Sequence, residues 1–428
     1  MSIHYACVLP HPPLILPEIG CGEEYKIQQT IDAYQIIANH IARIKPETIV
    51  LVTPHAPMFR DGFFLAQGTE DTGDMGRFNT AQLSYAYPID EEFTNALIEH
   101  NTDMRPSVMD LDHGTIVPLA MIRETYRSFK LVRIGVSGMN RDHHRALGEA
   151  IQHIANQLNR KTVFIASGDL SHRLKVDGPY GFNPDGPRFD HKVKQIIASN
   201  HLEELFKLST NQCHEAGECG YRSLLVLAGV LNDLKIKSEV VSYEAPFGVG
   251  YLCASIQIQD PLITLARKAI EHYVKDLSII TPDMTVNIGL HMQAACFVSL
   301  HKQNRLRGCI GTLQPTQNSL NQEIIHNAIA ACARDPRFNP VTEDELLDLE
   351  ISVDVLQPAE PTSKDQLDPR RFGVIVRSSR HTGVLLPDLE GIDTIDDQLK
   401  IACRKAGIAE TDEYSIERFE VKRHHAYL

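Results

Sequence analysis

The chain has 428 residues, of which 43% are hydrophobic, and this length is about two to three times a common domain size, so we expect two domains. No run of about 18 apolar residues suggests a membrane span. The formal net charge of −13, without a strong Lys/Arg run, argues against nucleic acid as a direct partner.

The amino terminus and the cysteines predict where the protein resides. Met1–Pro13 carries His4 and prolines, where a signal peptide needs a basic start and an apolar stretch, so secretion is not expected. The nine cysteines are scattered and form no C-x-x-C pair. This pattern fits reduced thiols rather than a disulfide framework. We therefore expect a cytoplasmic protein.

The first part of the chain alternates between predicted strands and helices. Ile3–Leu9 is apolar and rich in β-formers, Glu23–Lys45 has helical spacing, and Thr48–Thr53 is a second strand. A strand, a long helix and a strand form a right-handed unit with parallel strands. The same alternation returns in Leu131–Val136, Asp142–Leu158 and Thr162–Ala166. This predicts an α/β domain with a mainly parallel, helix-flanked sheet.

A second domain is expected to begin near Asp260. Ser238–Tyr243 and Gly250–Ile258 have the pattern of closing strands, and Pro261–Lys275 that of a helix leading away. We therefore divide the chain into residues 1–260 and 261–428. The second part is expected to contain a strand, a turn-rich segment and a helix, at Ala294–Leu300, Leu306–Pro315 and Leu320–Arg334.

Two histidines stand where predicted strands end. His11 follows the first strand and His55 follows the second, each beside prolines that restrict the backbone. In an open parallel sheet, ligands bind beyond the carboxyl ends of the strands. Because we expect these two strands to be neighbours about 5 Å apart, both imidazoles can reach one metal ion.

Three further segments point to the same edge of the sheet. Asp112–Gly114 precedes a predicted helix, Ser167–His172 follows a predicted strand, and Cys213–Gly220 stands at the start of another helix. A single histidine at a strand end is more often a turn residue than a ligand. Four histidines at such positions, beside Asp or Pro, favour a shared metal site.

The order of these segments resembles the LigB-like class III extradiol dioxygenases and their relatives, the Memo proteins. The motifs that carry the resemblance, within Met1–Gln259, are Pro10-His11-Pro12, Pro54-His55-Ala56, Asp112-His113-Gly114, Ser167-Gly168-Asp169 and Ser171-His172. The resemblance implies that His11 and His55 are metal ligands and that His172 is the catalytic acid/base. It also implies that His113 either contacts the metal ligands rather than the ion, which places it behind the ligands, or lies on the side of the ion where O2 would bind. Asp169 is then placed to orient the imidazole of His172 through its ring N–H.

The third ligand is where the sequence departs from the dioxygenases, in which a glutamate near the start of the late helix completes the set. The matching region offers Cys219, with Glu218 one residue before it, and Memo-like relatives carry a cysteine there. With Glu218 the set suits Fe(II), which we prefer, and leaves positions for a catecholate and O2. With Cys219, Zn(II) or Cu(I) compete. Glu244 is a further acidic candidate, and the choice stays open.

The string Leu306-Arg307-Gly308-Cys309-Ile310-Gly311 matches the signature of the AMMECR family. The match runs over Leu265–Phe419 and implies a smaller α+β domain whose biochemical role is not established. The glycines permit close approach of a ligand, and the guanidinium of Arg307 can bind a carboxylate or phosphate through two N–H groups. The alternative is a well-packed turn around a buried Cys309 thiol. If Cys309 were instead a nucleophile, it would need a nearby base, for which His301 and His381 are the candidates.

Three functions fit this combination. The first is a non-haem iron enzyme, an oxidoreductase resembling extradiol dioxygenases, that oxidises an aromatic or similarly chelating small molecule. The second is a catalytically altered, Memo-like scaffold for protein interaction or redox control, and the third is a metal-dependent hydrolase. Memo-like and AMMECR-like proteins occur beside a radical SAM protein, in systems of the AmmeMemoRadiSam type, which implies such a partner. The sequence leaves a homo-oligomer open.

Overall fold

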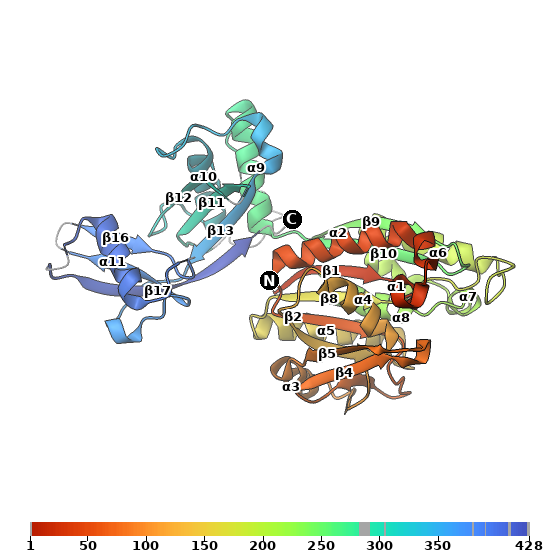
Figure 1. Cartoon of the computed structure of the whole chain (residues 1–428). Coiled ribbons are helices and arrows are strands. Elements are labelled where there is room, and N and C mark those ends of the chain that lie inside the picture. The colour runs from red at the N-terminus through yellow and green to blue at the C-terminus, as the bar shows by residue number, and fades with distance from the viewer. Residues whose placement is uncertain are drawn as a thin grey trace. The chain divides into compact units, whose positions relative to one another are not determined.

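The computed structural model describes residues 2–281, 292–303, 305–378, 381–389, 391–409 and 412–425. The chain divides into two compact units, Met1–Gln259 and Asp260–Ala426 (Figure 1). Within the described ranges, no helix combines the length and the apolar character that crossing a membrane requires.

The first unit is built on an eight-stranded sheet in the order β6-β3-β7-β2-β8-β1-β10-β9. Its four central strands, β7, β2, β8 and β1, are mutually parallel, whereas β10 and β9 close one edge in antiparallel fashion. The prediction of an α/β domain with a mainly parallel, helix-flanked sheet is confirmed, and antiparallel pairing at β3–β7, β1–β10 and β10–β9 makes the sheet a mixed one. The strands are β1 Ile3–Leu9, β2 Thr48–Thr53, β3 Phe63–Ala66, β6 Met104–Ser107, β7 Lys130–Gly135, β8 Thr162–Ser167, β9 Ile236–Glu244 and β10 Tyr251–Ile258.

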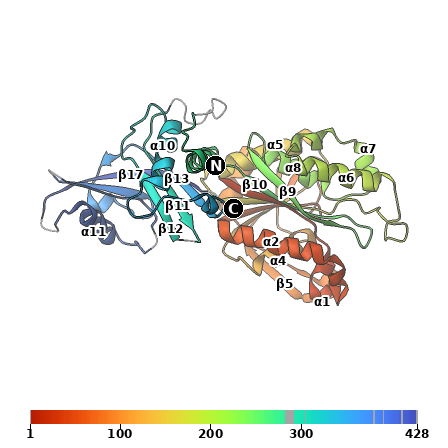
Figure 2. The same cartoon turned by 90° about the horizontal axis from the view of Figure 1, so that it is seen from above.

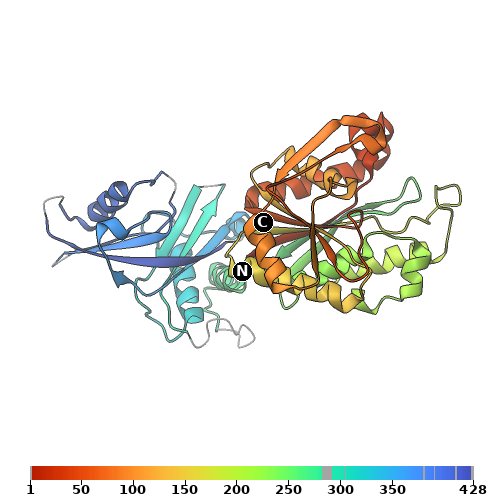
Figure 3. The same ribbon diagram turned by 90° about the horizontal axis from the view of Figure 1, so that it is seen from below.

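Helices cover both faces of this sheet, as Figures 2 and 3 show. One face packs against α2 and α4 and the other against α5, α6 and α8, so that the sheet separates two hydrophobic cores. A two-stranded hairpin, β4–β5, lies on the side of α4. The bounds are α1 Pro17–Gly20, α2 Gln28–Ile44, β4 Glu70–Met75, β5 Thr80–Pro88, α3 Glu91–His100, α4 His113–Arg123, α5 Arg141–Gln157, α6 Asp185–Ala198, α7 Thr210–Ala216 and α8 Tyr221–Val230.

Two expectations about this unit are corrected. The first two strands are not neighbours, because β8 lies between β1 and β2 and pairs with both. A crossover helix can carry the chain past one strand position, which a later strand then fills. The helix expected over Glu23–Lys45 begins later, since Glu23–Ile27 is a 3-10 helix and α2 starts at Gln28.

The second unit is an α+β domain with an antiparallel sheet in the order β12-β11-β13-β17-β15-β16, with β14 paired to β17. Helices α9 and α10 bury their apolar residues against β11 and β13. The elements are α9 Pro261–Asp276, β11 Cys296–Lys302, β12 Arg305–Gly311, α10 Leu320–Ala333, β13 Glu350–Leu356, β14 Glu360–Pro361, β15 Phe372–Arg377, β16 Thr382–Leu385, α11 Ile395–Ala406 and β17 Ser415–His425.

The expected turn-rich segment Leu306–Pro315 is instead a strand as far as Gly311. Gly308 is required here by packing rather than by a turn. A Cβ at this position would lie 2.2 Å from the carbonyl oxygen of Ala331 on α10. The glycine therefore allows β12 to approach the helix closely.

Candidate metal centre

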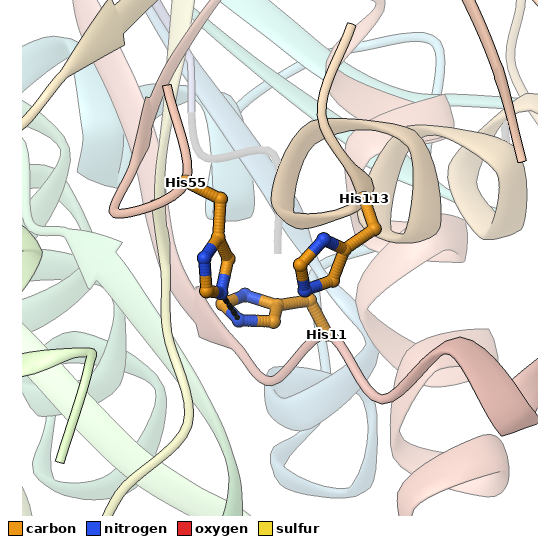
Figure 4. Close-up of side chains that lie close together, drawn as sticks. All are labelled: His11, His55 and His113. Atoms are coloured by element: carbon orange, nitrogen blue, oxygen red, sulfur yellow. Dashed lines mark hydrogen bonds between the residues drawn. The ribbon is translucent and has the colours of Figure 1, made fainter. Parts of the chain in front are cut away.

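His11 and His55 meet at the carboxyl edge of the first sheet. His11 lies two residues beyond the end of β1, and His55 lies two residues beyond the end of β2. These extensions bring the two side chains together although β8 lies between the two strands. Their Nε2 atoms are 2.9 Å apart, and their ring centroids are 4.7 Å apart (Figure 4). The two imidazoles can thus face one ion, as the strand-end positions predicted.

His113, the first residue of α4, joins these two rings (Figure 4). Its ring centroid lies 4.1 Å from that of His55 and 5.3 Å from that of His11. Each of the three histidines offers a nitrogen within 4.8 Å of the others. The sequence resemblance placed His113 behind the ligands or on the oxygen side, and the structure brings it into a group that could hold the ion.

The buried hydroxyl of Ser167 determines which nitrogen of His11 is free. Its Oγ lies 2.5 Å from the carbonyl oxygen of Gly114, which can only accept a hydrogen bond, so the single hydroxyl proton points there. His11 Nδ1, 2.8 Å from the same Oγ, must then donate to it. The neutral ring therefore carries its proton on Nδ1 and directs the Nε2 lone pair toward His55, the arrangement of a metal ligand.

Cys219 and Asp169 form a second group around His11. The Cys219 Sγ is 3.6 Å from His11 Nε2, and it accepts a hydrogen bond of 3.2 Å from the backbone N–H of Asp169. One donor atom from each of the three residues lies within 4.8 Å of the others. The close approach depends on glycine, because a Cβ on Gly168 would lie 2.2 Å from the Cα of Gly220.

Glu218 points elsewhere. Its carboxylate accepts a hydrogen bond of 2.6 Å from the backbone N–H of Tyr221 at the start of α8, and it belongs to neither group of ligand atoms found in the described part of the chain. Glu244 is also engaged, since it accepts from the backbone N–H and the hydroxyl of Thr30 at 2.6 and 2.7 Å. The geometry therefore brings Cys219 to the cluster and leaves both glutamates outside it.

His172, predicted to be the acid/base, lies near the cluster but outside both groups. Its ring centroid is 5.2 Å from that of Tyr180, and its Nε2 is buried without a hydrogen-bond partner. The expected contact with Asp169 is not found among the described residues. The Asp169 carboxylate instead accepts a hydrogen bond of 2.9 Å from the backbone N–H of His11, so it fixes the loop after β1.

Burial keeps these imidazoles neutral. Desolvation, reinforced by the neighbouring rings, holds the pKa of His11 well below its ordinary value and lowers that of His113 to about 4. Desolvation likewise lowers the pKa of His172 to about 4. Burial raises the pKa of Asp169 to about 7 and that of the Cys219 thiol well above its usual range. At neutral pH the histidines therefore offer lone pairs rather than positive charge.

An ion network that the sequence reading missed holds His113 in place. Arg133, fully buried on β7, binds both carboxylate oxygens of Asp71 at 2.7 and 2.9 Å and one oxygen of Asp112 at 3.2 Å. Asp112 also accepts a hydrogen bond of 2.6 Å from the hydroxyl of Thr53, at the end of β2. The signal for this network was an arginine within an otherwise apolar strand, because a buried guanidinium requires a partner.

The histidine cluster opens into a cavity of about 1050 Å³, which we call the hairpin cavity. His55 and His113 line it together with residues of the β4–β5 hairpin, including Phe78 and Tyr85. Its volume suits a small organic molecule. Polar, cationic and aromatic side chains thus surround the open side of the candidate metal site.

The side chains of the AMMECR signature bind residues of their own domain, although Cys309 is half-buried and Leu306 is exposed. One edge of the Arg307 guanidinium binds Glu345, with Nε and Nη2 at 3.1 and 2.8 Å from the carboxylate oxygens, and on the other edge Nη1 donates to the carbonyl oxygen of Asn339 at 2.9 Å. The thiol of Cys309 accepts a hydrogen bond of 3.1 Å from Ser299 on β11. In the parts of this domain that the structure describes, no histidine is bonded to that thiol.

Known families and proteins are similar to one or both domains of this chain. The family described as "Catalytic LigB subunit of aromatic ring-opening dioxygenase" matches residues 5–254, and the AMMECR1 family matches residues 263–424. Protein CA_C1420 of Clostridium acetobutylicum is 39% identical and covers 99% of both chains. A Thermotoga maritima protein is 48% identical over 39% of this chain and 98% of its own.

Two solved structures of uncharacterized proteins are also similar. Protein PH0010 from Pyrococcus horikoshii is 31% identical, with 38% of this chain and 88% of its own covered and a TM-score of 0.36. Protein JW3007 from Escherichia coli K12 is 16% identical, with 59% and 99% covered and a TM-score of 0.43. From the two family matches and the full-length relative, the chain belongs to the LigB family through its first domain and carries an AMMECR1 domain after it.

Proposed function

We propose that the first domain is a non-haem iron oxidoreductase that oxidises an aromatic or similarly chelating small molecule. The observation that carries this proposal is the pair of Nε2 atoms of His11 and His55, 2.9 Å apart. Two nitrogen atoms this close could both bind one ion, because metal–nitrogen bonds are about 2.1 Å long. The spacing therefore matches two ligands that share an ion, and the LigB family match supports oxygen chemistry there.

The residues that would hold the ion are His11, His55 and a third ligand, for which Cys219 and His113 are the nearest candidates. When bound, the ion supplies a centre at which O2 and the chelating groups of the substrate meet. The chain's own residues supply the remaining functions. Ser167 holds the His11 ring, and the hairpin cavity receives the substrate beside His55.

His172 is our candidate for moving the substrate proton. Its Nε2 is buried without a partner, and its pKa of about 4 keeps the ring neutral at neutral pH. A neutral imidazole can take the proton of a substrate hydroxyl and later return it. The role requires that substrate binding bring the hydroxyl within hydrogen-bond distance of this ring.

A second function, a metal-binding scaffold without dioxygenase activity, is favoured by Cys219. Its sulfur is 3.6 Å from His11 Nε2, whereas Glu218 is turned away. A thiolate ligand makes Zn(II) or Cu(I) competitive with Fe(II). The two proposals therefore differ in the ion that the purified protein holds.

The test is metal analysis of anaerobically purified protein combined with O2 uptake in the presence of a catechol. We expect one Fe(II) per chain, with turnover abolished but metal retained in His172→Ala, and both lost in His11→Ala. His153→Ala, an exposed histidine on α5, is the control and should retain both. Stoichiometric Zn(II) or Cu(I) without O2 uptake would favour the scaffold, and release of the ion by His172→Ala would refute our assignment of roles.

The third ligand is tested by two neighbouring variants. Cys219→Ser should lower the metal content, whereas Glu218→Gln should leave it unchanged, because only the cysteine faces His11. The opposite result would show that the segment rearranges when the ion binds.

A further inference from the structure

A second cavity opens on the other helical layer of the first domain. It has a volume of about 850 Å³ and is lined by residues at the starts of α5 and α8 and along α7. These helices lie on the face of the sheet opposite α2 and α4 (Figure 2). We call this space the α5–α8 cavity. It shares no lining residue with the hairpin cavity.

Positive side chains outnumber carboxylates in its lining. Three arginines, Arg141, Arg173 and Arg222, face two acidic residues, Asp142 and Glu218. The whole chain carries a formal net charge of −13, so a local excess of positive charge is a departure from the rest of the molecule. Such a site attracts an anion against the average field of the protein.

The charge of Arg141 is held in place but not neutralised. Its guanidinium donates to the carbonyl oxygen of Phe206 at 2.7 Å and to the hydroxyl of Thr210 at 2.8 Å, and it lies over the ring of Tyr221 at 5.4 Å from the centroid. All three contacts are with uncharged groups. The arginine is therefore preorganised and still able to bind an anion.

Arg222 supplies a second positive charge at the same cavity. Its side chain is exposed, and the ion pairs formed by the described residues do not include it. Arg173 is partly neutralised, since Glu215 lies 3.6 Å from its guanidinium. Arg141 and Arg222 are thus the cations available to a ligand.

The remaining walls are apolar. Met139, Phe206, Tyr221 and Leu225 contribute hydrophobic or aromatic surface to the cavity. A volume in this range accommodates a small organic molecule rather than an inorganic ion alone. The ligand that fits therefore has an anionic head and an apolar body.

We propose that the α5–α8 cavity binds a small organic anion, a carboxylate or a phosphate monoester with an apolar body, through Arg141 and Arg222. A guanidinium fork matches the oxygens of either group and forms charge-assisted hydrogen bonds with them. Glu218 lines the cavity directly before Cys219, so the bound anion lies against the segment that carries a candidate metal ligand. The anion is a second ligand, separate from a substrate in the hairpin cavity.

Titration calorimetry with phenyl phosphate and with benzoate tests this proposal on the full chain, treated with a chelator so that no metal binds either probe. We expect saturable binding with a Kd of about 1 mM or tighter for at least one probe. Arg222→Gln and Arg141→Gln should each weaken it about tenfold. Arg188→Gln, which removes an equal charge from the exposed surface of α6, is the matched control and should change it less than about twofold.

The better probe identifies the anionic group, phosphate monoester or carboxylate, and either result supports the site. Three results would overturn the proposal. These are no saturable binding up to about 10 mM of either probe, equal weakening in Arg188→Gln, and binding that is seen only without the chelator. Thermal melting of each variant checks that it is folded, and Arg222→Gln, at an exposed position, keeps the test open if Arg141→Gln fails to fold.

Discussion

Replacing Ser167 by alanine should weaken metal binding, although the serine itself is not a ligand. In the native chain its hydroxyl donates to Gly114 O at 2.5 Å and accepts from His11 Nδ1 at 2.8 Å. Ser167→Ala leaves the Nδ1–H of a buried ring without an acceptor. The ring can then turn or move its proton to Nε2, and either change withdraws the lone pair that faces His55.

The size of the effect follows from these contacts. The His11–Ser167 hydrogen bond strengthens when Nε2 binds a cation, because the ion polarises the ring and makes Nδ1–H a better donor. Removal of such a supporting partner costs about 10- to 100-fold in metal affinity, or about 1.4–2.7 kcal/mol. The metal-free domain should also lose about 1–3 kcal/mol of stability, because Gly114 O loses its donor.

Competition between the protein and a chelating dye for Zn(II) and for Fe(II), the latter without oxygen, measures this affinity. Ser223→Ala is the control, because Ser223 is equally buried in the same domain but its hydroxyl makes only a long bond of 3.5 Å to Val52 O. A change of less than twofold in Ser167→Ala, or an equal loss in both variants, would refute the argument that the hydroxyl sets the His11 tautomer.

Two further predictions concern stability. Arg133→Met should lower the free energy of unfolding of the first domain by about 3–5 kcal/mol, because it leaves the carboxylates of Asp71 and Asp112 without their cation. A loss below about 1 kcal/mol in urea unfolding would contradict the buried ion network. Burial holds the pKa of His113 and His172 at about 4, below the value of about 6.5 in an unfolded chain. The unfolded chain therefore binds more protons at these two histidines between these values, so their contribution to the stability of the metal-free domain is complete above about pH 6.5 and is lost toward pH 4. The raised pKa of Asp169, about 7, acts in the opposite direction, so the test compares the native chain with His113→Gln. A urea midpoint that changes equally in both chains between pH 7 and pH 5 would contradict the contribution of His113.

The positions of the histidines could be read from the sequence because they depend on a simple rule. Parallel strands end at one edge of a sheet, so His11 and His55 had to emerge on the same side. The order of the strands could not be read in this way. A crossover helix fixes the direction of the next strand but not how many positions it skips, and β8 fills the gap between β1 and β2.

Contacts between distant segments were harder to predict. Arg133 was not recognised from the sequence, although it is a charge within a largely apolar strand, and its partner Asp71 lies on a hairpin that no sequence pattern connects to that strand. The strand β12 was mistaken for a turn for a related reason. Its glycine suggested a bend, whereas the close approach of α10, distant in sequence, is what requires it.

The choice between Glu218 and Cys219 shows what only three-dimensional structure supplies. Both residues stand in the short connection between α7 and α8, so the sequence treats them almost equally. In the structure Gly217 ends α7 in a left-handed conformation, and Gly220 packs against Gly168. Because the backbone is fixed at both ends, the two neighbouring side chains point to different sides. Cys219 faces His11. Glu218 accepts a hydrogen bond from the first turn of α8 and lines the α5–α8 cavity. A rotation of this one segment would exchange a soft ligand for a hard one, so the chemistry of the metal site depends on what holds these two glycines in place.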